Sequence, residues 1–376
     1  MTWLFVTSFF ICKNSNIKTH RQHPGNKYYS RQFIILMKIV IDDKIPYIRE
    51  AMAKITSDTV YINGKDIKAT DVSDANALVV RTRTVCGESL LKDSSVRFVA
   101  TATIGYDHLD TEWLGRAGIT WMSCPGCNAG SVAQYLRSVL ILLLRRRLVR
   151  RGGTVGIVGC GHVGGRVREV ARGMGFRVLV CDPPRHDRGE SGCGASMEDI
   201  AHMSDVITFH VPLTHCGAYP TWHIAGARFF EALRRAPVII NTSRGGVVDE
   251  AALLCAMDSG KVSQAVIDTW ENEPDVNRRL LDRAFIGTPH IAGYSADGKV
   301  NADNMVLAGV CGFFGIADVP HVVPPPLVLD CPLPARGTED YYLRLYDPLS
   351  DSARLKSSPG TFEDLRGNYP LRREQF

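Results

Sequence analysis

The sequence predicts an α/β protein with two doubly wound parallel-sheet domains that flank a cleft, followed by a small C-terminal α+β region. From Met37 onward, short β-branched apolar runs alternate with helical stretches, which is typical of a parallel sheet covered by helices. A glycine-rich turn at residues 159–164 opens a second series of the same kind. After Ile316 the prolines at 320–326 mark a linker to the C-terminal region. The 376 residues suffice for two or three domains of roughly 100–200 residues each.

The composition is that of an ordinary globular protein, with 45% hydrophobic and 22% charged residues. The net charge of +5 suits an anionic ligand as well as a nucleic acid, so charge alone decides nothing. The eleven cysteines have no repeated spacing, and we expect a reduced, cytoplasmic protein. Cys124 and Cys127 form a C-x-x-C pair, which a redox or zinc site would also use. Because no second pair or histidine cluster accompanies it, we interpret it as a Pro-Gly turn and expect no metal.

Residues 1–36 differ from the rest of the chain. The apolar run Trp3–Cys12 has ten residues, whereas a membrane-spanning helix needs about 20. It could be the hydrophobic part of a signal peptide, but no basic segment precedes it and no small-residue cleavage site follows. A clear strand pattern starts only at Met37. We therefore predict that residues 1–36 are an extension outside the fold, and that the protein has no membrane partner.

The first series predicts three strands and then a long helix. The expected strands are Ile39–Ile41, Ala77–Val80 and Arg97–Ala100. The helix, Asn128–Arg147, keeps its apolar positions at helical spacing. It ends in arginines at 145–147 and 150–151, and cations complement the dipole of a last turn. A nucleic-acid patch would also use arginines, but this one lacks interleaved aromatics and a second basic stripe, so we expect no nucleic-acid partner.

The second series predicts five buried parallel strands and sets the domain boundaries. These strands are Val155–Val158, Val178–Cys181, Val206–Phe209, Val238–Ile240 and Ala265–Ile267, near-continuously apolar as buried parallel strands are. A further helix is expected over Ser295–Phe314. We assign 37–127 with 293–316 to a substrate-binding domain, 128–292 to a cofactor-binding domain and 317–376 to a C-terminal dimerisation region.

The glycine-rich turn indicates a Rossmann-like dinucleotide site. Residues 159–164 match G-x-G-x-x-G, after a strand and at the start of a helix, which is the context that the motif requires. Gly159 permits the tight turn, Gly161 lets the backbone approach a pyrophosphate, and Gly164 allows close helix–strand packing. His162 and Val163 lie between them, where the first free N–H groups of the helix face the phosphates.

Asp182 indicates which dinucleotide binds. It ends the strand after the turn, close to the roughly 20-residue spacing expected for the acid that binds the ribose hydroxyls. A carboxylate there repels a 2′-phosphate, so NAD is favoured over NADP. Arg185 follows closely and weakens that preference.

Three strand ends carry polar residues that a plain core does not need. The segments 241–246, 268–274 and 288–294 each follow a predicted strand, and ligands of open parallel sheets bind outside the carboxyl ends of strands. These segments should therefore line one crevice.

The residues of these segments suit the oxidation of a 2-hydroxy acid. His290 can take the hydroxyl proton, because imidazole titrates near neutrality. Glu273 can keep this base basic and fix its tautomer. Arg244 offers a bidentate fork for the substrate carboxylate. Asp268 is expected nearer the nicotinamide.

These motifs resemble the D-isomer-specific 2-hydroxyacid dehydrogenases, whose catalytic Arg, Glu and His correspond to Arg244, Glu273 and His290. Residues 210–214, His-Val-Pro-Leu-Thr, are similar to the family's cofactor-side loop. The likeness extends from Met37 to the C-terminus. It is closest to a branch that acts on a small phosphorylated 2-hydroxy acid, and it is thinner after residue 316.

The resemblance implies NAD as cofactor, a homodimer, and further site residues. Thr82, Thr103 and Tyr294 would contact substrate. The cofactor would be contacted by Asp182, Val211, Asp268 and Gly293.

Some features depart from the family or leave alternatives. Val211 lacks the hydroxyl usual at that position, so only its backbone can serve the cofactor, and Gln134 stands where an acid is usual. In the family the C-terminal region builds the dimer, and in this chain that region is shortened. Another dehydrogenase of the family, such as one for phosphoglycerate, and a non-catalytic NAD-sensing protein are the alternatives.

Overall fold

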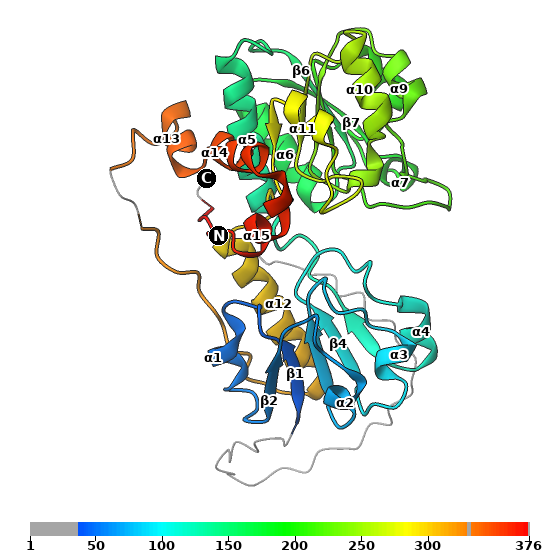
Figure 1. Ribbon diagram of the computed structural model, residues 1–376, viewed down its shortest axis with the longest axis vertical. Helices are drawn as coiled ribbons and strands as arrows, with labels where there is room; N and C mark the ends of the chain where they lie inside the picture. Colours follow the sequence, from blue (N-terminus) through cyan, green and yellow to red (C-terminus); the bar gives the residue numbers. More distant parts are fainter. Residues whose placement is uncertain (1–36, 329–331, 375–376) are drawn as a thin grey trace. The chain divides into compact units, whose positions relative to one another are not determined.

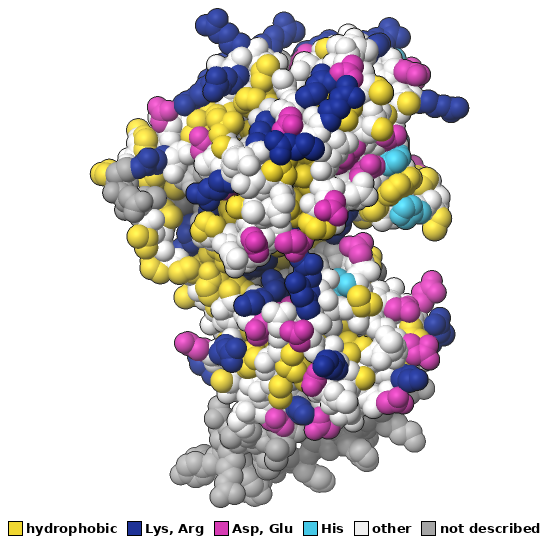
Figure 2. All heavy atoms as spheres, viewed as in Figure 1, with side chains coloured by type: hydrophobic (Ala, Val, Ile, Leu, Met, Phe, Trp, Pro, Cys, Tyr) yellow, Lys and Arg dark blue, Asp and Glu magenta, His cyan; other side chains and the backbone are white. Residues whose placement is uncertain are grey.

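A computed structural model describes residues 37–328 and 332–374 (Figure 1). The extension that we predict at residues 1–36 lies outside the described residues. On the face drawn in Figure 2, acidic and basic side chains are interspersed, in keeping with the small net charge of +5.

The first sheet has five parallel strands in the order β2-β1-β3-β4-β5. Their bounds are β1 Ile39–Asp42, β2 Thr59–Ile62, β3 Ala77–Val80, β4 Phe98–Thr101 and β5 Thr120–Met122. The three central strands were predicted, with β4 shifted by one residue, whereas the two edge strands β2 and β5 were not. Every residue of β1, β3 and β4 is buried, but those of β2 and β5 are half-buried or exposed. Edge strands therefore lack the continuous apolar run that identifies a central parallel strand.

Helices cover both faces of the first sheet. The short helices that follow the first four strands are α1 Ile48–Met52, α2 Ala69–Val72, α3 Glu88–Leu91 and α4 Thr111–Arg116. The face of Ile39 and Ile41 packs with α1 and with Val306 and Val310 of a later helix, α12 (Ala296–Phe314). The chain therefore returns to this sheet after completing the second one.

The second sheet has six parallel strands in the order β11-β10-β9-β8-β6-β7. Their bounds are β6 Thr154–Val158, β7 Arg177–Cys181, β8 Val206–Phe209, β9 Val238–Asn241, β10 Gln264–Ile267 and β11 Ile286–Gly287. All five strands of the predicted series are present, and β11, the strand expected just before residues 288–294, pairs with β10 at the edge. The order reverses beside β6, which is the topological switch point where open α/β sheets bind ligands.

The helices associated with the second sheet position the glycine-rich turn. The predicted long helix is α5, Ala129–Arg145, and it packs on α6, His162–Gly173. The others are α7 Pro183–Asp187, α8 Met197–Met203, α9 Ala227–Glu231, η1 Gly245–Val247, α10 Glu250–Asp258 and α11 Arg278–Arg283. No helix among the described residues is long and apolar enough to cross a membrane.

The C-terminal region is helical where the structure describes it. Its elements are α13 Glu339–Leu345, α14 Pro348–Ser357, η2 Pro359–Thr361 and α15 Phe362–Gly367. We expected an α+β mixture, but β pairing in residues 332–374 is limited to one bridge between Ser295 and Arg372. Leu355 and Phe362 are buried in the core of the second sheet, so this region packs on the cofactor side of the molecule.

The C-x-x-C pair forms a turn, as its Pro-Gly centre predicts. Gly126 has φ +80, a conformation that glycine adopts without strain. Both cysteines are buried free thiols. Burial raises the pKa of Cys127 to about 12 and that of Cys124 well above its ordinary value. Across residues 37–328 and 332–374 no group of three or more His, Cys, Asp or Glu is placed to hold a metal ion.

Candidate functional site

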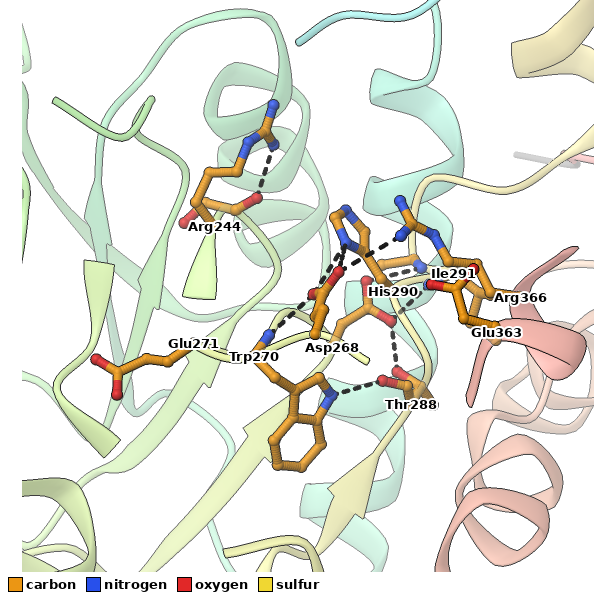
Figure 3. A network of polar contacts seen from close by, with 12 residues as sticks. Arg244, Asp268, Trp270, Glu271, Thr288, His290, Ile291, Glu363 and Arg366 are labelled. Atoms are coloured by element: carbon orange, nitrogen blue, oxygen red, sulfur yellow. Dashed lines mark hydrogen bonds and ion pairs between the residues drawn. The ribbon is translucent and has the colours of Figure 1, made fainter. Parts of the chain in front are cut away.

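The three polar segments that follow β9, β10 and β11 meet at one edge of the second sheet. These strands are neighbours and parallel, so the side chains beyond their carboxyl ends lie close together. Figure 3 shows His290 between Arg244 and Arg366 of α15, and Asp268 lies close to His290, whose backbone N–H donates to the Asp268 carbonyl. The sequence predicted this gathering, apart from Arg366.

His290 and Glu273 form a close pair. The Nδ1 atom of His290 lies 2.8 Å from Oε2 and 3.0 Å from Oε1 of Glu273. Glu273 thus occupies one ring nitrogen and leaves Nε2 for a substrate. His290 adopts φ +56, an uncommon backbone conformation for a residue other than glycine, and one that clusters at functional sites.

Glu273 is held as an anion by its surroundings. Its Oε1 accepts a hydrogen bond of 3.0 Å from the backbone N–H of Trp270, and Arg366 Nη1 lies 3.5 Å from Oε2. Burial would raise the pKa of Glu273, but His290, Arg366 and this N–H together lower it below its ordinary value. A carboxylate charged at neutral pH favours the protonated imidazole and fixes the ring orientation.

Asp268 is buried and holds the loop that carries His290. Its carboxylate accepts hydrogen bonds from the Thr288 hydroxyl at 2.6 Å and from the backbone N–H groups of Ile291 and Ala292 at 2.8 and 2.9 Å. Burial raises the pKa of Asp268 despite these bonds. The structure thus shows that Asp268 binds residues of the loop 288–292. The expected contact of Asp268 with the cofactor stays a prediction.

Arg244 connects the two sheets. Its Nη1 donates to the carbonyl of Ser243 at 2.8 Å, and Nη2 lies 3.5 Å from Asp107 Oδ2, in the loop after β4. A side chain at Gly105 would clash with the guanidinium, so the glycine lets Arg244 lie on this loop. One third of the Arg244 side chain is exposed, so guanidinium N–H groups remain available to donate to a substrate carboxylate.

The glycine turn has the shape that a pyrophosphate requires. A Cβ atom at Gly159 would lie 2.7 Å from the His210 carbonyl, one at Gly164 would overlap the Gly159 carbonyl, and one at Gly161 would meet nothing within 4 Å. Gly159 also has φ +86. Gly161 caps α6 without a side-chain hydrogen bond, so the N–H groups that begin at His162 and Val163 are available to an anion.

Other cofactor-side residues have partners within the protein. Asp182 Oδ2 accepts from the backbone N–H of Cys160 at 2.7 Å, and Oδ1 accepts from that of Arg185 at 3.2 Å. The Arg185 guanidinium is paired with Glu190. That pairing offsets the attraction which Arg185 would otherwise exert on a 2′-phosphate.

Two further predicted cofactor contacts, Val211 and Gly293, have close neighbours within the protein. The side chain of Val211 lies against Gly159, within 2.7 Å of where a Cβ atom would be, and a Cβ atom at Gly293 would clash with Asn128. Both positions therefore border the strand ends, where their backbone groups can meet a cofactor.

Unpartnered buried polar atoms at the strand ends support a bound cofactor. His210 Nδ1, Thr242 Oγ1, Thr269 Oγ1 and Asn128 Oδ1 have no hydrogen-bond partner among the described residues. His210 and Thr242 directly follow β8 and β9, Thr269 is the second residue after β10, and Asn128 precedes α5. Burial lowers the pKa of His210 to about 3, so it is neutral. Buried polar groups normally find partners, and the amide and hydroxyl groups of a dinucleotide can supply them.

The three predicted substrate residues differ in their surroundings. Thr82 is exposed after β3. Thr103 lies after β4, and its hydroxyl bonds that of Thr101 at 2.7 Å and the Gly105 carbonyl at 2.8 Å. Tyr294 lies four residues after His290 and approaches Lys299 and Arg366. Contact of all three with a substrate stays a prediction.

Sequence analysis missed the contributions of the C-terminal region. Arg366 reaches Glu273, and Arg372 Nε donates to Gln134 Oε1 at 3.0 Å. Gln134 Nε2 also donates to the Arg373 carbonyl at 2.9 Å. The amide at position 134, which departs from the family pattern, therefore serves as donor and acceptor to the C-terminal segment, which a carboxylate cannot do.

Comparison with known proteins agrees with this geometry. Residues 145–292 match the family described as D-isomer specific 2-hydroxyacid dehydrogenase, NAD binding domain. The erythronate-4-phosphate dehydrogenase of Bacteroides thetaiotaomicron is 51% identical over 344 residues, which cover 90% of this chain and 97% of that protein. The enzyme of the same name from an Enterobacter species is 40% identical over 349 residues, 90% of this chain and 92% of its own.

Solved structures share the fold. The NAD-bound 3-phosphoglycerate dehydrogenase of Entamoeba histolytica has a TM-score of 0.63 and 27% identity, covering 78% of this chain and all of its own. The D-lactate dehydrogenase of Aquifex aeolicus, solved with NAD and lactic acid, has a TM-score of 0.61 at 24% identity, covering 77% of this chain and all of its own. The second sheet of this chain is thus an NAD-binding domain.

Proposed function

Because the chain belongs to the D-isomer-specific 2-hydroxyacid dehydrogenases and, within them, to the erythronate-4-phosphate dehydrogenases, we propose that it oxidises 4-phospho-D-erythronate with NAD. The product is 2-oxo-3-hydroxy-4-phosphobutanoate, and the reaction is a step of pyridoxine 5′-phosphate (vitamin B6) biosynthesis. The observation that carries this proposal is the His290–Glu273 pair at 2.8 Å, on strand ends beside the dinucleotide turn.

The catalytic roles follow from the geometry. His290 takes the C2 hydroxyl proton through Nε2, while Glu273 holds the ring through Nδ1 and stabilises the imidazolium. Arg244 binds the substrate carboxylate and polarises the C2 oxygen. NAD, when bound, accepts the hydride that leaves C2 as the C–O bond becomes a carbonyl. The chain's own residues therefore account for the proton and for the charge of the substrate.

Residues of three kinds hold the ligands in this proposal. Gly159, Gly161 and Gly164, with His162 and Val163, receive the pyrophosphate. Further cofactor contacts come from Asp182, Val211, Asp268 and Gly293. Thr82, Thr103 and Tyr294 contact substrate.

The experiment that tests the function is NADH formation with 4-phospho-D-erythronate against a panel of 2-hydroxy acids. The panel includes 3-phosphoglycerate, because a dehydrogenase of that name shares the fold at 27% identity. We expect the highest kcat/KM for 4-phospho-D-erythronate. A higher value for another acid reassigns the substrate, and NAD binding without turnover of any acid favours a non-catalytic sensor.

We also propose a homodimer that acts in the cytoplasm. Val319, Val323 and Val328, at the start of the C-terminal region, are 48%, 72% and 82% exposed, and apolar side chains exposed in this way suit an interface. The described cysteines are all free thiols, as in a reducing compartment. The mass of the protein in solution, measured by light scattering, tests the dimer.

We further propose three parts for the chain. They are the substrate domain 37–127 with 293–316, the cofactor domain 128–292 and the C-terminal region 317–376. The presence of two sheets, and the return of α12 to the first of them, support this division.

A further inference from the structure

Three cationic side chains surround Tyr294, and the catalytic set proposed above uses none of them. Lys299 Nζ lies 4.2 Å from the centre of the Tyr294 ring, and the Arg366 guanidinium hydrogen-bonds the Tyr294 hydroxyl. Burial would raise the pKa of Tyr294, yet Lys299, Arg366 and Arg81 together lower it below its ordinary value. We call Arg81, Lys299 and Arg366 the cation cluster.

The cation cluster is assembled from distant parts of the chain. Arg81 follows β3, Lys299 lies in the first turns of α12, and Arg366 lies on α15. The side chains of Arg81 and Arg366 are only 23% and 18% exposed. Burying guanidinium groups is costly unless anions or hydrogen-bond acceptors compensate them.

The carboxyl groups of the described residues compensate the charge of the cluster only in part, which leaves a surplus of positive charge. Asp268 acts on Arg366 and Asp303 acts on Lys299, but burial raises the pKa of both carboxyl groups, that of Asp303 to about 7. Arg81 Nε lies 3.1 Å from Asp42 Oδ2, and Arg366 Nη1 lies 3.5 Å from Glu273 Oε2. Glu273 also pairs with His290 at the shorter distance of 2.8 Å, so it is only a partial partner for Arg366. A group with two negative charges and several acceptor oxygens matches this surplus.

The position of the cluster relative to His290 matches the order of groups in the substrate. In Figure 3, Arg244 and Arg366 lie on opposite sides of His290. In 4-phospho-D-erythronate, the carbon that is oxidised also lies between two anions, the carboxylate on C1 and the phosphate on C4. With the carboxylate on Arg244 and the C2 hydroxyl at His290, the phosphate points toward Arg366.

The C-terminal segment holds Arg366 in place through several contacts. Glu363 pairs with Arg83, in the loop that also carries Arg81. Phe362 is buried in the core, and the ring of Tyr369 packs edge-to-face on Tyr294 at 6.2 Å. Helix α15 is thus fixed to both the substrate side and the cofactor side of the site.

We propose that Arg366, with Arg81 and Lys299, binds the phosphate group of the substrate, so that α15 gives the enzyme its preference for a phosphorylated acid. This inference rests on the function proposed above. It assigns to the C-terminal region a contact with substrate, in addition to dimerisation.

The experiment compares 4-phospho-D-erythronate with D-erythronate, which lacks the phosphate, for wild type, Arg366→Gln, Lys299→Gln and a control. The control is Arg344→Gln, an exposed arginine on α13. We expect Arg366→Gln to raise KM for the phosphorylated acid by about 10–100-fold, as for loss of a charge-assisted contact. The loss of kcat/KM for D-erythronate should be much smaller, because that loss comes only through the contact of Arg366 with Glu273, so the preference for the phosphorylated acid should fall. Lys299→Gln should act in the same direction, and Arg344→Gln should match wild type. Inorganic phosphate should compete with substrate less well in both cluster variants.

Several outcomes would overturn the inference. One is an unchanged ratio of the two kcat/KM values in Arg366→Gln, with thermal unfolding confirming a folded variant. Another is an equal loss of kcat for both acids with a shifted pH profile, which would mean that Arg366 acts only through Glu273. If wild type oxidises neither acid, the proposed function fails. Calorimetric titration with inorganic phosphate then tests whether the cation cluster binds phosphate. Weaker binding of phosphate to Arg366→Gln than to wild type supports the inference, and equal binding overturns it.

Discussion

At the scale of single residues, the chemistry depends on one imidazole whose Nδ1 is bound and whose Nε2 is available. Asp268 fixes the backbone on both sides of His290 through Thr288, Ile291 and Ala292. Glu273 fixes the ring itself. Backbone and side chain are thus positioned by two carboxylates from one segment, and the base is oriented before substrate arrives.

His290→Ala should lower kcat by about 10²–10⁴-fold, the usual cost of removing a positioned general base. NAD affinity should change little, because the cofactor is held mainly at the turn 159–164. Turnover and fluorescence titration of NAD measure the two effects. Near-normal turnover in this variant would mean that another group takes the proton.

Glu273→Gln should move the acidic limb of the kcat–pH profile for oxidation to lower pH, because a neutral amide no longer favours the protonated imidazole. The pKa of Glu273 lies below its ordinary value. The ordinary pKa of a glutamate is about 4.3, so Glu273 is charged at every pH above that value. It loses its charge only when the pH falls through its own, lower pKa. Measured from pH 5 upward, wild type has this charge and the variant does not. Superimposable profiles would contradict the role of Glu273.

At the scale of secondary-structure elements, the β6–α6 connection determines how the cofactor binds. The turn depends on carbonyl groups that approach Gly159 and Gly164 closely, where no side chain fits. The beginning of α6 then presents unbonded N–H groups, which stabilise a pyrophosphate through hydrogen bonds and the helix dipole.

Gly164→Ala should raise KM for NAD by about tenfold or more, because the added methyl group would overlap the Gly159 carbonyl and displace the turn. Gly165→Ala is the matched control. It lies next to Gly164 in α6, and a Cβ atom there meets nothing within 4 Å, so the control should bind NAD normally and gain up to about 1 kcal/mol of helix stability. Steady-state kinetics and thermal unfolding test both. Equal KM values for the two variants would show that the turn tolerates a side chain.

The central elements could be predicted from the sequence, and the peripheral ones could not. β1, β3 and β8 are buried along their whole length, so hydrophobicity alone identifies them. β5 is half-buried or exposed at the sheet edge and has three residues, too few for a recognisable pattern. The helices α1–α4 have four to six residues, fewer than two turns, and their stability comes from packing rather than from local sequence.

The same distinction applies to the site. Arg244, Glu273 and His290 could be predicted because the carboxyl ends of neighbouring parallel strands converge. Arg366 could not, because no spacing rule relates a short C-terminal helix to those strand ends. Its place depends on tertiary contacts such as the burial of Phe362, which a single sequence does not reveal.

At the scale of the whole molecule, the C-terminal segment connects parts that are far apart in sequence. Arg372 is buried, and its guanidinium donates to Gln134, Ser131 and the carbonyl groups of Ile291 and Ala292. It also lies 4.0 Å over the ring of Tyr346. One side chain thereby joins α5, the loop after His290 and the C-terminal region.

Arg372→Ala should lower the free energy of unfolding by about 3 kcal/mol, because several buried acceptors lose their partner at once. Chemical denaturation followed by fluorescence measures this. Arg344→Ala, on the exposed face of α13, is the control and should stay near wild type. If the two variants unfold alike, Arg372 does not hold the C-terminal segment in place.

The return of α12 to the first sheet has a consequence for synthesis on the ribosome. Met37, Ile39 and Ile41 share their core with Ala302, Val306 and Val310, and the cofactor sheet lies between these two groups in the chain. Roughly 180 residues separate the end of β5 from Ala302, and at about 5–20 residues per second their translation takes about 10–40 s. During that time the apolar face of the nascent first sheet is covered only in part, by α1. The first sheet to be made is therefore completed only after the whole second sheet has been translated, and its partly covered face favours aggregation until α12 appears.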